Sequence, residues 1–153
     1  AATTDLGHPT CIHPAKKLEV GQRLALLALA KDYGIEGIPS PSPTYKSMER
    51  EKDKLVISFN NLSEPYKFND ANSIVGFSET GTMRLQGFEI AHMKWWENKI
   101  MVSSDKVPEP VAVRYAFKNF CPEANVKTNY GLPLAPFRTD NWEIPAEEIG
   151  EIR

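Results

Sequence analysis

The sequence lacks the features that would assign it to a membrane-bound or nucleic-acid-binding class. No apolar run is long enough to cross a bilayer, and the first residues have neither the basic nor the apolar region of a signal peptide. The 18 basic and 20 acidic residues are interspersed and form no basic stripe. We therefore expect no nucleic-acid partner and no membrane partner.

Cysteine is also scarce. Cys11 and Cys121 are the only two, and they are far apart in the sequence. Two thiols cannot define a disulfide framework, so we expect two small buried residues rather than a bridge. The chain is nevertheless 41% hydrophobic over 153 residues, which is enough for a packed core. This length fits one domain, or part of one domain joined to a small second one.

A helix is predicted for residues 15–33, which contain no proline and are rich in alanine, leucine, lysine and glutamate. Pro14 suits the first turn of this helix, and Gly34 suits the position just past its end. Gly21 is the weak point, because glycine is about 1 kcal/mol less favourable than alanine inside a helix. An apolar stripe at helical spacing is formed by Leu24, Leu27 and Ala28.

The pattern changes after residue 34. Residues 37–43 contain three prolines at alternate positions, which favour an extended linker and mark the best domain boundary. Beyond it, alternating apolar residues predict strands, with turns at Asp53 and at Glu97-Asn98. The predicted strands are 54–59, 84–91, 99–103 and 111–117. From Cys121 onward we expect ordered loop or extended chain. Short strands without intervening helices favour an antiparallel sandwich.

The densest group of candidate functional side chains lies in residues 5–14, just before the predicted helix. His13 is expected near the positive end of the helix dipole, which helps keep the imidazole neutral, as a general base requires. Asp5 is close enough in sequence to orient that ring. A histidine of a loop or helix cap explains the same position. The metal alternative is weak, because no standard zinc spacing is formed by Asp5, His8, Cys11 and His13.

Several short motifs follow one another in a recognisable order. Before the linker they are Asp5-Leu6-Gly7, Ile12-His13-Pro14, Val20-Gly21, Arg23-Leu24-Ala25-Leu26 and Ala28-Leu29-Ala30-Lys31-Asp32-Tyr33-Gly34. After it they include Tyr45-Lys46-Ser47-Met48, Gly87-Phe88-Glu89-Ile90, Pro110-Val111-Ala112-Val113-Arg114-Tyr115, Gly131-Leu132-Pro133 and Pro136-Phe137-Arg138-Thr139-Asp140. Together they resemble the C-terminal part of the sialate O-acetylesterase family, which belongs to the SGNH hydrolases. The final block of that family has an aspartate and a His-Pro pair before a closing helix.

The resemblance implies a serine esterase that removes O-acetyl groups from sialic acids or related acetylated glycans and needs no cofactor. His13 matches the histidine that takes the proton of the attacking serine. Asp5 matches the family's aspartate less directly, because the common spacing places the acid three residues before the histidine, where this chain has Thr10. Either Asp5 or a backbone carbonyl would then orient the His13 ring.

No segment of the chain matches the nucleophile motif of the family well. The segment from Gly76 to Gly81 is one residue too long for a nucleophile elbow, and we interpret its Ser78 as a loop serine. The oxyanion-hole motifs are missing as well. We therefore expect the chain to be inactive alone and to need the N-terminal part of the same hydrolase, in cis or as a second chain. Because acetylated glycans lie outside the cell, the family implies a secreted or periplasmic location.

The resulting prediction has two parts. Residues 1–37 are the C-terminal segment of an α/β SGNH-hydrolase domain, with the histidine loop and the closing helix, and residues 38–153 are an all-β antiparallel sandwich that serves as an accessory domain. Arg114 is expected to face outward or to pair with a carboxylate, and one residue of Trp95-Trp96 is expected in the core. The competing prediction is a non-catalytic β-sandwich module that binds a glycan or a protein, with the helix as a docking arm.

Overall fold

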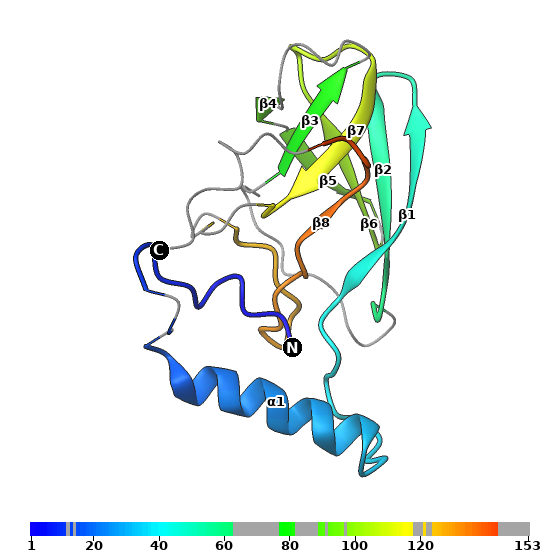
Figure 1. Cartoon of the computed structure of the whole chain (residues 1–153). Coiled ribbons are helices and arrows are strands. Elements are labelled where there is room, and N and C mark those ends of the chain that lie inside the picture. Colours follow the sequence, from blue (N-terminus) through cyan, green and yellow to red (C-terminus); the bar gives the residue numbers. More distant parts are fainter. Residues whose placement is uncertain are drawn as a thin grey trace.

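The computed structural model of the chain describes residues 1–11, 13, 15–62, 77–81, 89–90, 92–96, 98–117, 121 and 124–143. For residues 77–81, 89–90 and 92–96 the description covers the backbone only. The predictions for Pro14, for Glu97, for most of 84–91 and for the side chains of Trp95 and Trp96 lie outside the described part. In that part, one helix stands beside a region of antiparallel strands (Figure 1).

The helix α1 spans Lys17–Lys31, inside the predicted range. Its C-cap is Asp32, and two residues further on Gly34 turns the chain away, with a positive φ of 64° that alanine would adopt only with strain. Beyond the last turn, the N–H of Tyr33 donates to Ala28 O at 3.1 Å and the N–H of Ile35 donates to Leu29 O at 3.0 Å. The helix and its stop signal are therefore confirmed.

The surface of α1 is poorly covered. No residue of the helix is fully buried, and Leu18 and Leu24 are 72% and 53% exposed. Of the predicted apolar stripe, Leu27 and Ala28 are half-buried. Apart from the adjacent residues and the helix's own backbone, no described atom lies within 4 Å of a Cβ added at Gly21, so packing against another described segment does not explain that glycine. A 15-residue helix is marginal in water without a packed face.

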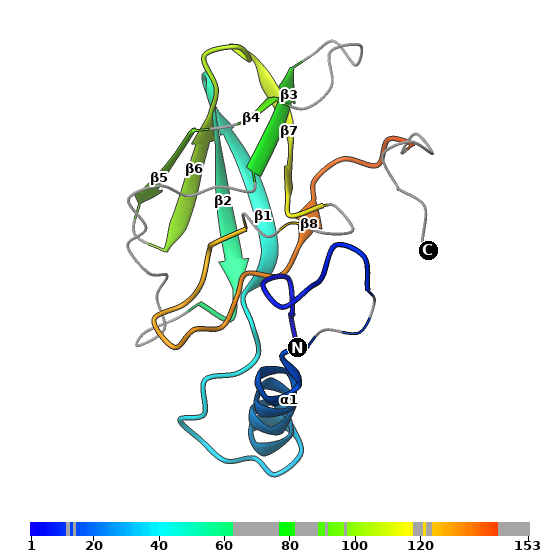
Figure 2. The ribbon, with the colours of Figure 1, turned by 90° about the vertical axis from the view of Figure 1, so that its left-hand side faces the viewer.

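Within the described residues, the strands form two four-stranded antiparallel sheets (Figures 1 and 2). The first has the order β1-β2-β6-β5, made of Thr44–Glu51, Lys54–Asn60, Lys99–Ser103 and His92–Trp96. The second has the order β4-β3-β7-β8, made of Glu89–Ile90, Phe77–Gly81, Pro110–Tyr115 and Phe137–Arg138. The β-rich character expected after the proline linker is confirmed.

Local sequence signals locate the hairpins well. The predicted turn at Asp53 joins β1 to β2, with Lys52 at a φ of 57°, and Asn98 lies in the turn between β5 and β6. The prediction for Ser78 was wrong, because this residue lies in β3 and not in a loop. Its short polar strand is paired on both sides, by β4 and by β7, so long-range pairing overrides a weak local signal.

One hydrophobic cluster receives side chains from both sheets. The first sheet contributes Leu55, Ile57, Ile100 and Val102, and the second contributes Val113, Tyr115 and Phe137. The C-terminal loops add Cys121, Ala124, Val126 and Leu134 to the same cluster. Burial was therefore predicted correctly for Cys121 but not for Cys11, which is exposed in the N-terminal loop, and no disulfide joins these two cysteines.

Residues 124–136 form an ordered loop that packs on this core, as expected. The N–H of Leu134 donates to Val126 O at 2.9 Å, and Lys127 forms an isolated bridge with Pro133. The N–H of Val126 donates in turn to the buried Tyr115 hydroxyl at 3.2 Å. The loop is therefore held at its base by backbone and core contacts. Among the described residues, no helix is both long and apolar enough to span a bilayer.

Gly21 within α1 and Gly34 just beyond it provide a matched pair of substitutions. Gly21→Ala is expected to stabilise α1 by about 1 kcal/mol, because the site is open and alanine favours the helix. Gly34→Ala is expected to destabilise the helix end by about 1 kcal/mol, because φ is positive there. Amide hydrogen exchange of residues 17–31 measures both effects. Equal exchange rates in the two variants would contradict this account.

Candidate functional site

The loop before α1 contains the histidine that sequence reasoning selected. His13 is exposed, and its backbone N–H approaches Cys11 Sγ at 3.4 Å. The helix begins at Lys17, so His13 belongs to the preceding loop and not to the first turn, within which a helix dipole acts. The argument that the dipole acts directly on His13 is therefore not supported, and the catalytic role of His13 stays a prediction.

The other polar residues of this loop form a local turn. The His8 Nδ1 atom lies 3.3 Å from both the N–H and the Oγ1 of Thr10. This contact is exposed and joins residues two positions apart. In the described part of the chain, no three His, Cys, Asp or Glu side chains lie close enough together to hold a metal ion.

Asp5 lies at the centre of an ion cluster with Arg23 and Lys127. The Arg23 Nη1 and Nη2 atoms donate to Asp5 Oδ1 and Oδ2 at 2.7 and 2.8 Å, a bidentate pair. Lys127 Nζ lies 2.8 Å from the same Oδ2. The side chains of Asp5 and Arg23 are each only 10% exposed. We refer to Asp5, Arg23 and Lys127 as the Asp5 cluster.

The electrostatics of the Asp5 cluster favour an ionised carboxylate. Burial alone would raise the pKa of Asp5, but hydrogen bonds and positive charge from Arg23 and Lys127 outweigh it and hold that pKa well below its usual range. Asp5 is therefore a fixed anion at any ordinary pH. Both carboxylate oxygens already have cationic partners, and no hydrogen bond joins Asp5 to His13.

Sequence reasoning did not find the two cations of the cluster. Arg23 lies beside the apolar stripe, four residues before Leu27, and was noted only within a motif. The sequence hint that Arg23 could reach Asp5 is its place on the helix that follows the Asp5 loop in the chain. Lys127 has no comparable signal, because it reaches Asp5 from a loop more than a hundred residues later.

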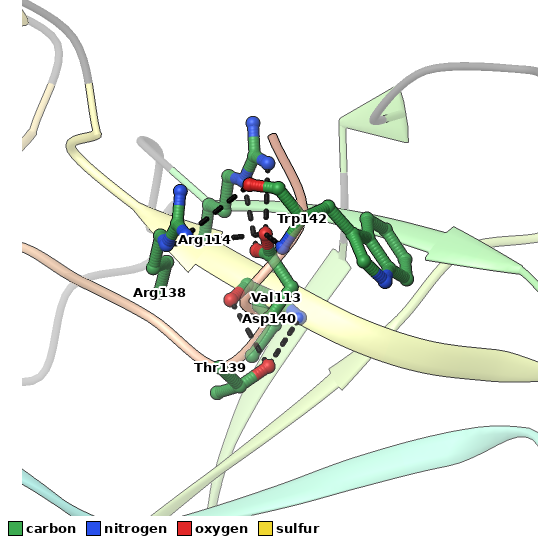
Figure 3. Close-up of polar contacts among 6 residues, drawn as sticks. All are labelled: Val113, Arg114, Arg138, Thr139, Asp140 and Trp142. Atoms are coloured by element: carbon green, nitrogen blue, oxygen red, sulfur yellow. Dashed lines mark hydrogen bonds and ion pairs between the residues drawn. The ribbon is translucent and has the colours of Figure 1, made fainter. Parts of the chain in front are cut away.

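A second ion cluster lies where the C-terminal segment crosses β7 (Figure 3). Arg114 donates from Nε and Nη2 to the two oxygens of Asp140, both at 2.9 Å. Their side chains are 8% and 1% exposed. Arg114 was expected either to face outward or to pair with a carboxylate, and the pairing is confirmed. Burial would raise the pKa of Asp140, but the Arg114 hydrogen bonds and charge lower it.

Neighbouring contacts extend this second cluster. The Trp142 N–H donates to Asp140 Oδ1 at 3.3 Å, and Arg138 Nη2 donates to Trp142 O at 3.2 Å. The guanidinium groups of Arg114 and Arg138 lie 5.5 and 5.4 Å from the centre of the Phe117 ring. Thr139 completes the attachment, since its Oγ1 accepts the Val113 N–H at 2.9 Å. These contacts fasten the C-terminal segment to β7.

Comparison with known proteins gives a match among solved structures. No protein-family profile and no curated protein sequence matches the chain. Among solved structures, it is similar to the crystal structure of a novel carbohydrate acetylesterase from Xanthomonas citri, with 34% sequence identity and a TM-score of 0.81. The similarity covers 90% of this chain and 31% of that one. The chain is thus related to a carbohydrate acetylesterase and spans about a third of its length.

Asp5→Asn is expected to lower the free energy of unfolding at pH 7 by about 2 kcal/mol, because it leaves Arg23 partly buried without its charged partner. The pKa of Asp5 is lower in the folded chain than in the unfolded one. The carboxylate therefore stabilises the fold above about pH 4 and loses this effect as the pH falls further. Urea unfolding at pH 7 and pH 3 should show a smaller acid effect in the variant than in the native chain. An unchanged acid effect would contradict this assignment.

Asp140→Asn is expected to destabilise the chain by about 3 kcal/mol, because a buried Arg114 would lose its bidentate partner. Arg138→Met serves as the matched control, with an expected loss of about 1 kcal/mol. Its Nε atom lies 3.9 Å from Asp140 and its side chain is 25% exposed. Thermal unfolding measures both variants. If the two losses were equal, Arg114–Asp140 would not be the dominant ion pair of this cluster.

Proposed function

We propose that the chain is the C-terminal part of a serine esterase of the SGNH type, which removes O-acetyl groups from sialic acids or related acetylated glycans. The main support is the similarity to a carbohydrate acetylesterase over 90% of the chain at 34% identity. The motif order from Asp5-Leu6-Gly7 to Thr139-Asp140 supports the sialate O-acetylesterase family. The proposed location is secreted or periplasmic, where such glycans occur.

In this proposal, residues 1–37 complete an α/β hydrolase domain and residues 38–153 form a β-sandwich accessory domain. Exposed apolar side chains on and just after α1 support the first assignment. Its apolar residues Leu18 and Leu24 are exposed, and Tyr33 and Ile35 beyond its end are 75% and 47% exposed. The partner that would cover them is the N-terminal part of the same hydrolase, which would also bring the serine.

The proposed chemistry is acyl transfer through His13. A serine of the N-terminal part attacks the acetyl carbonyl, and its proton passes to the His13 imidazole. His13 then donates this proton to the sugar oxygen, which leaves as a hydroxyl while the acetyl group stays on the serine. A water molecule then attacks the acetyl carbon while His13 takes one of its protons. The bond between the serine oxygen and the acetyl carbon breaks, His13 returns the proton to that serine oxygen, and the product leaves as acetic acid, which ionises to acetate. With its carboxylate held by Arg23 and Lys127, Asp5 would support the His13 loop.

The competing function is a β-sandwich module that binds a glycan or a protein without catalysis. One observation favours it: within the part of the chain that the structure describes, no serine side chain hydrogen-bonds to His13. The two functions differ in the partner they need. The esterase requires a polypeptide with a Gly-x-Ser nucleophile, whereas the module binds its ligand alone. Native mass spectrometry of the purified protein would reveal such a polypeptide.

His13→Ala in the esterase reassembled with its serine-bearing part is expected to lower kcat by about 10³-fold or more, because the general base is lost. Acetate release from an acetylated glycan measures the loss, with His8→Ala as the control because the His8 ring hydrogen-bonds to Thr10 within the same exposed turn. Near-normal turnover of the His13 variant would refute the esterase proposal for this histidine.

A further inference from the structure

The Asp5 cluster joins three segments that are distant in the sequence. Asp5 belongs to the N-terminal loop, Arg23 to α1, and Lys127 to the C-terminal loop that packs on the β core. In both views the N-terminal segment lies between α1 and the sheets (Figures 1 and 2). Lys127 is thus the member of the cluster that connects the helical region to the β region.

Arg23 and Asp5 close the loop that contains His13. The loop leaves from Asp5 and ends at α1, where the Arg23 side chain returns to bind the Asp5 carboxylate at both oxygens. Arg23 Nη1 also donates to Ala2 O at 2.9 Å, and the buried Leu6 follows Asp5 directly. Both ends of the loop are therefore fixed to one carboxylate. The position of this Arg23–Asp5 pair relative to the sheets depends on other contacts. One of them is the ion pair between Lys127 and Asp5.

Lys127 is a suitable anchor because its backbone does not depend on the helical region. Its neighbour Val126 is 2% exposed and bonds to Leu134 and to the Tyr115 hydroxyl. The Lys127 side chain is 35% exposed, so methionine can replace it without filling a closed space. Loss of its charge would leave the bidentate Arg23–Asp5 pair in place. Removing Lys127 would then release the loop from the β region without unpairing a buried charge.

We propose that Lys127 is a positioning residue of the esterase, through which the β domain sets the place of the His13 loop by holding Asp5. This inference rests on the proposed function. It gives Asp5 a role other than orienting the imidazole ring, because its two oxygens bind Arg23 and Lys127. It also gives the accessory domain a part in the reaction that needs no contact between the β domain and the substrate.

The first test needs no esterase activity. Amide hydrogen exchange of residues 1–11 in this chain is compared for the native protein, Lys127→Met and Lys127→Arg. Lys127→Met is expected to raise exchange in this segment by about 10-fold or more, while β2 and β6 stay protected. Lys127→Arg keeps the charge and is expected to restore most of the protection. The control is Lys46→Met, because Lys46 is exposed on β1. Unchanged exchange in Lys127→Met would overturn the proposal.

The second test measures turnover in the esterase reassembled with its serine-bearing part. With 4-nitrophenyl acetate, Lys127→Met is expected to lower kcat by about 10- to 100-fold with little change in KM, since a small displacement of the base mainly affects the chemical step. Lys127→Arg should recover most of this loss, and Lys46→Met should have no effect. A rise in KM with kcat unchanged, or no rescue by arginine, would overturn the positioning role.

The two proposals fail in different ways. If His13→Ala abolishes turnover but Lys127→Met does not reduce it, the esterase stands and the positioning role is wrong. If the exchange result holds but His13→Ala leaves turnover intact, the Lys127 contact is structural and the proposed function is wrong. A Lys127→Met chain that fails to fold, judged by circular dichroism, would also refute the proposal, because it predicts release of the loop in an intact β region.

Discussion

The Asp5 carboxylate binds two cations that approach from distant parts of the chain. Arg23 holds it in a fork from the helix, and Lys127 reaches it from a loop on the β core. A carboxylate that is 90% covered would be unfavourable without such partners. The position of the N-terminal loop relative to the sheets is therefore coupled to charge pairing, whereas the sheets themselves are held by apolar burial.

The β region is held together mainly by its own core and does not depend on the Asp5 cluster. Its two sheets share one hydrophobic cluster, and its C-terminal segment returns to β7 through the buried Arg114–Asp140 pair. Backbone bonds at Val126 and Leu134 fix the loop between them. These contacts matter for Lys127, because a side chain can position another segment only if its own backbone is held independently.

The sequence predicted the elements whose signals are local. Gly34 ends the helix where its left-handed conformation is needed, and the alternation around Leu55 and Ile57 identifies β2. Ser78 was misplaced because β3 is defined by its neighbours and not by its own residues. The candidate site shows the same limit. Asp5 and His13 share a short motif-rich loop, whereas Lys127 becomes part of the cluster only through the fold.

The exposed groups of the helical region have one common explanation. His13 has no serine partner within the described residues, and the apolar side chains of Leu18 and Leu24 face solvent on α1. A lone helix of this length is not stable by propensity alone, so its outer face is expected to pack on another surface. The chain spans about a third of the length of the carbohydrate acetylesterase to which it is similar. In the proposed esterase, the serine-bearing part would both supply the nucleophile for His13 and cover the outer face of α1.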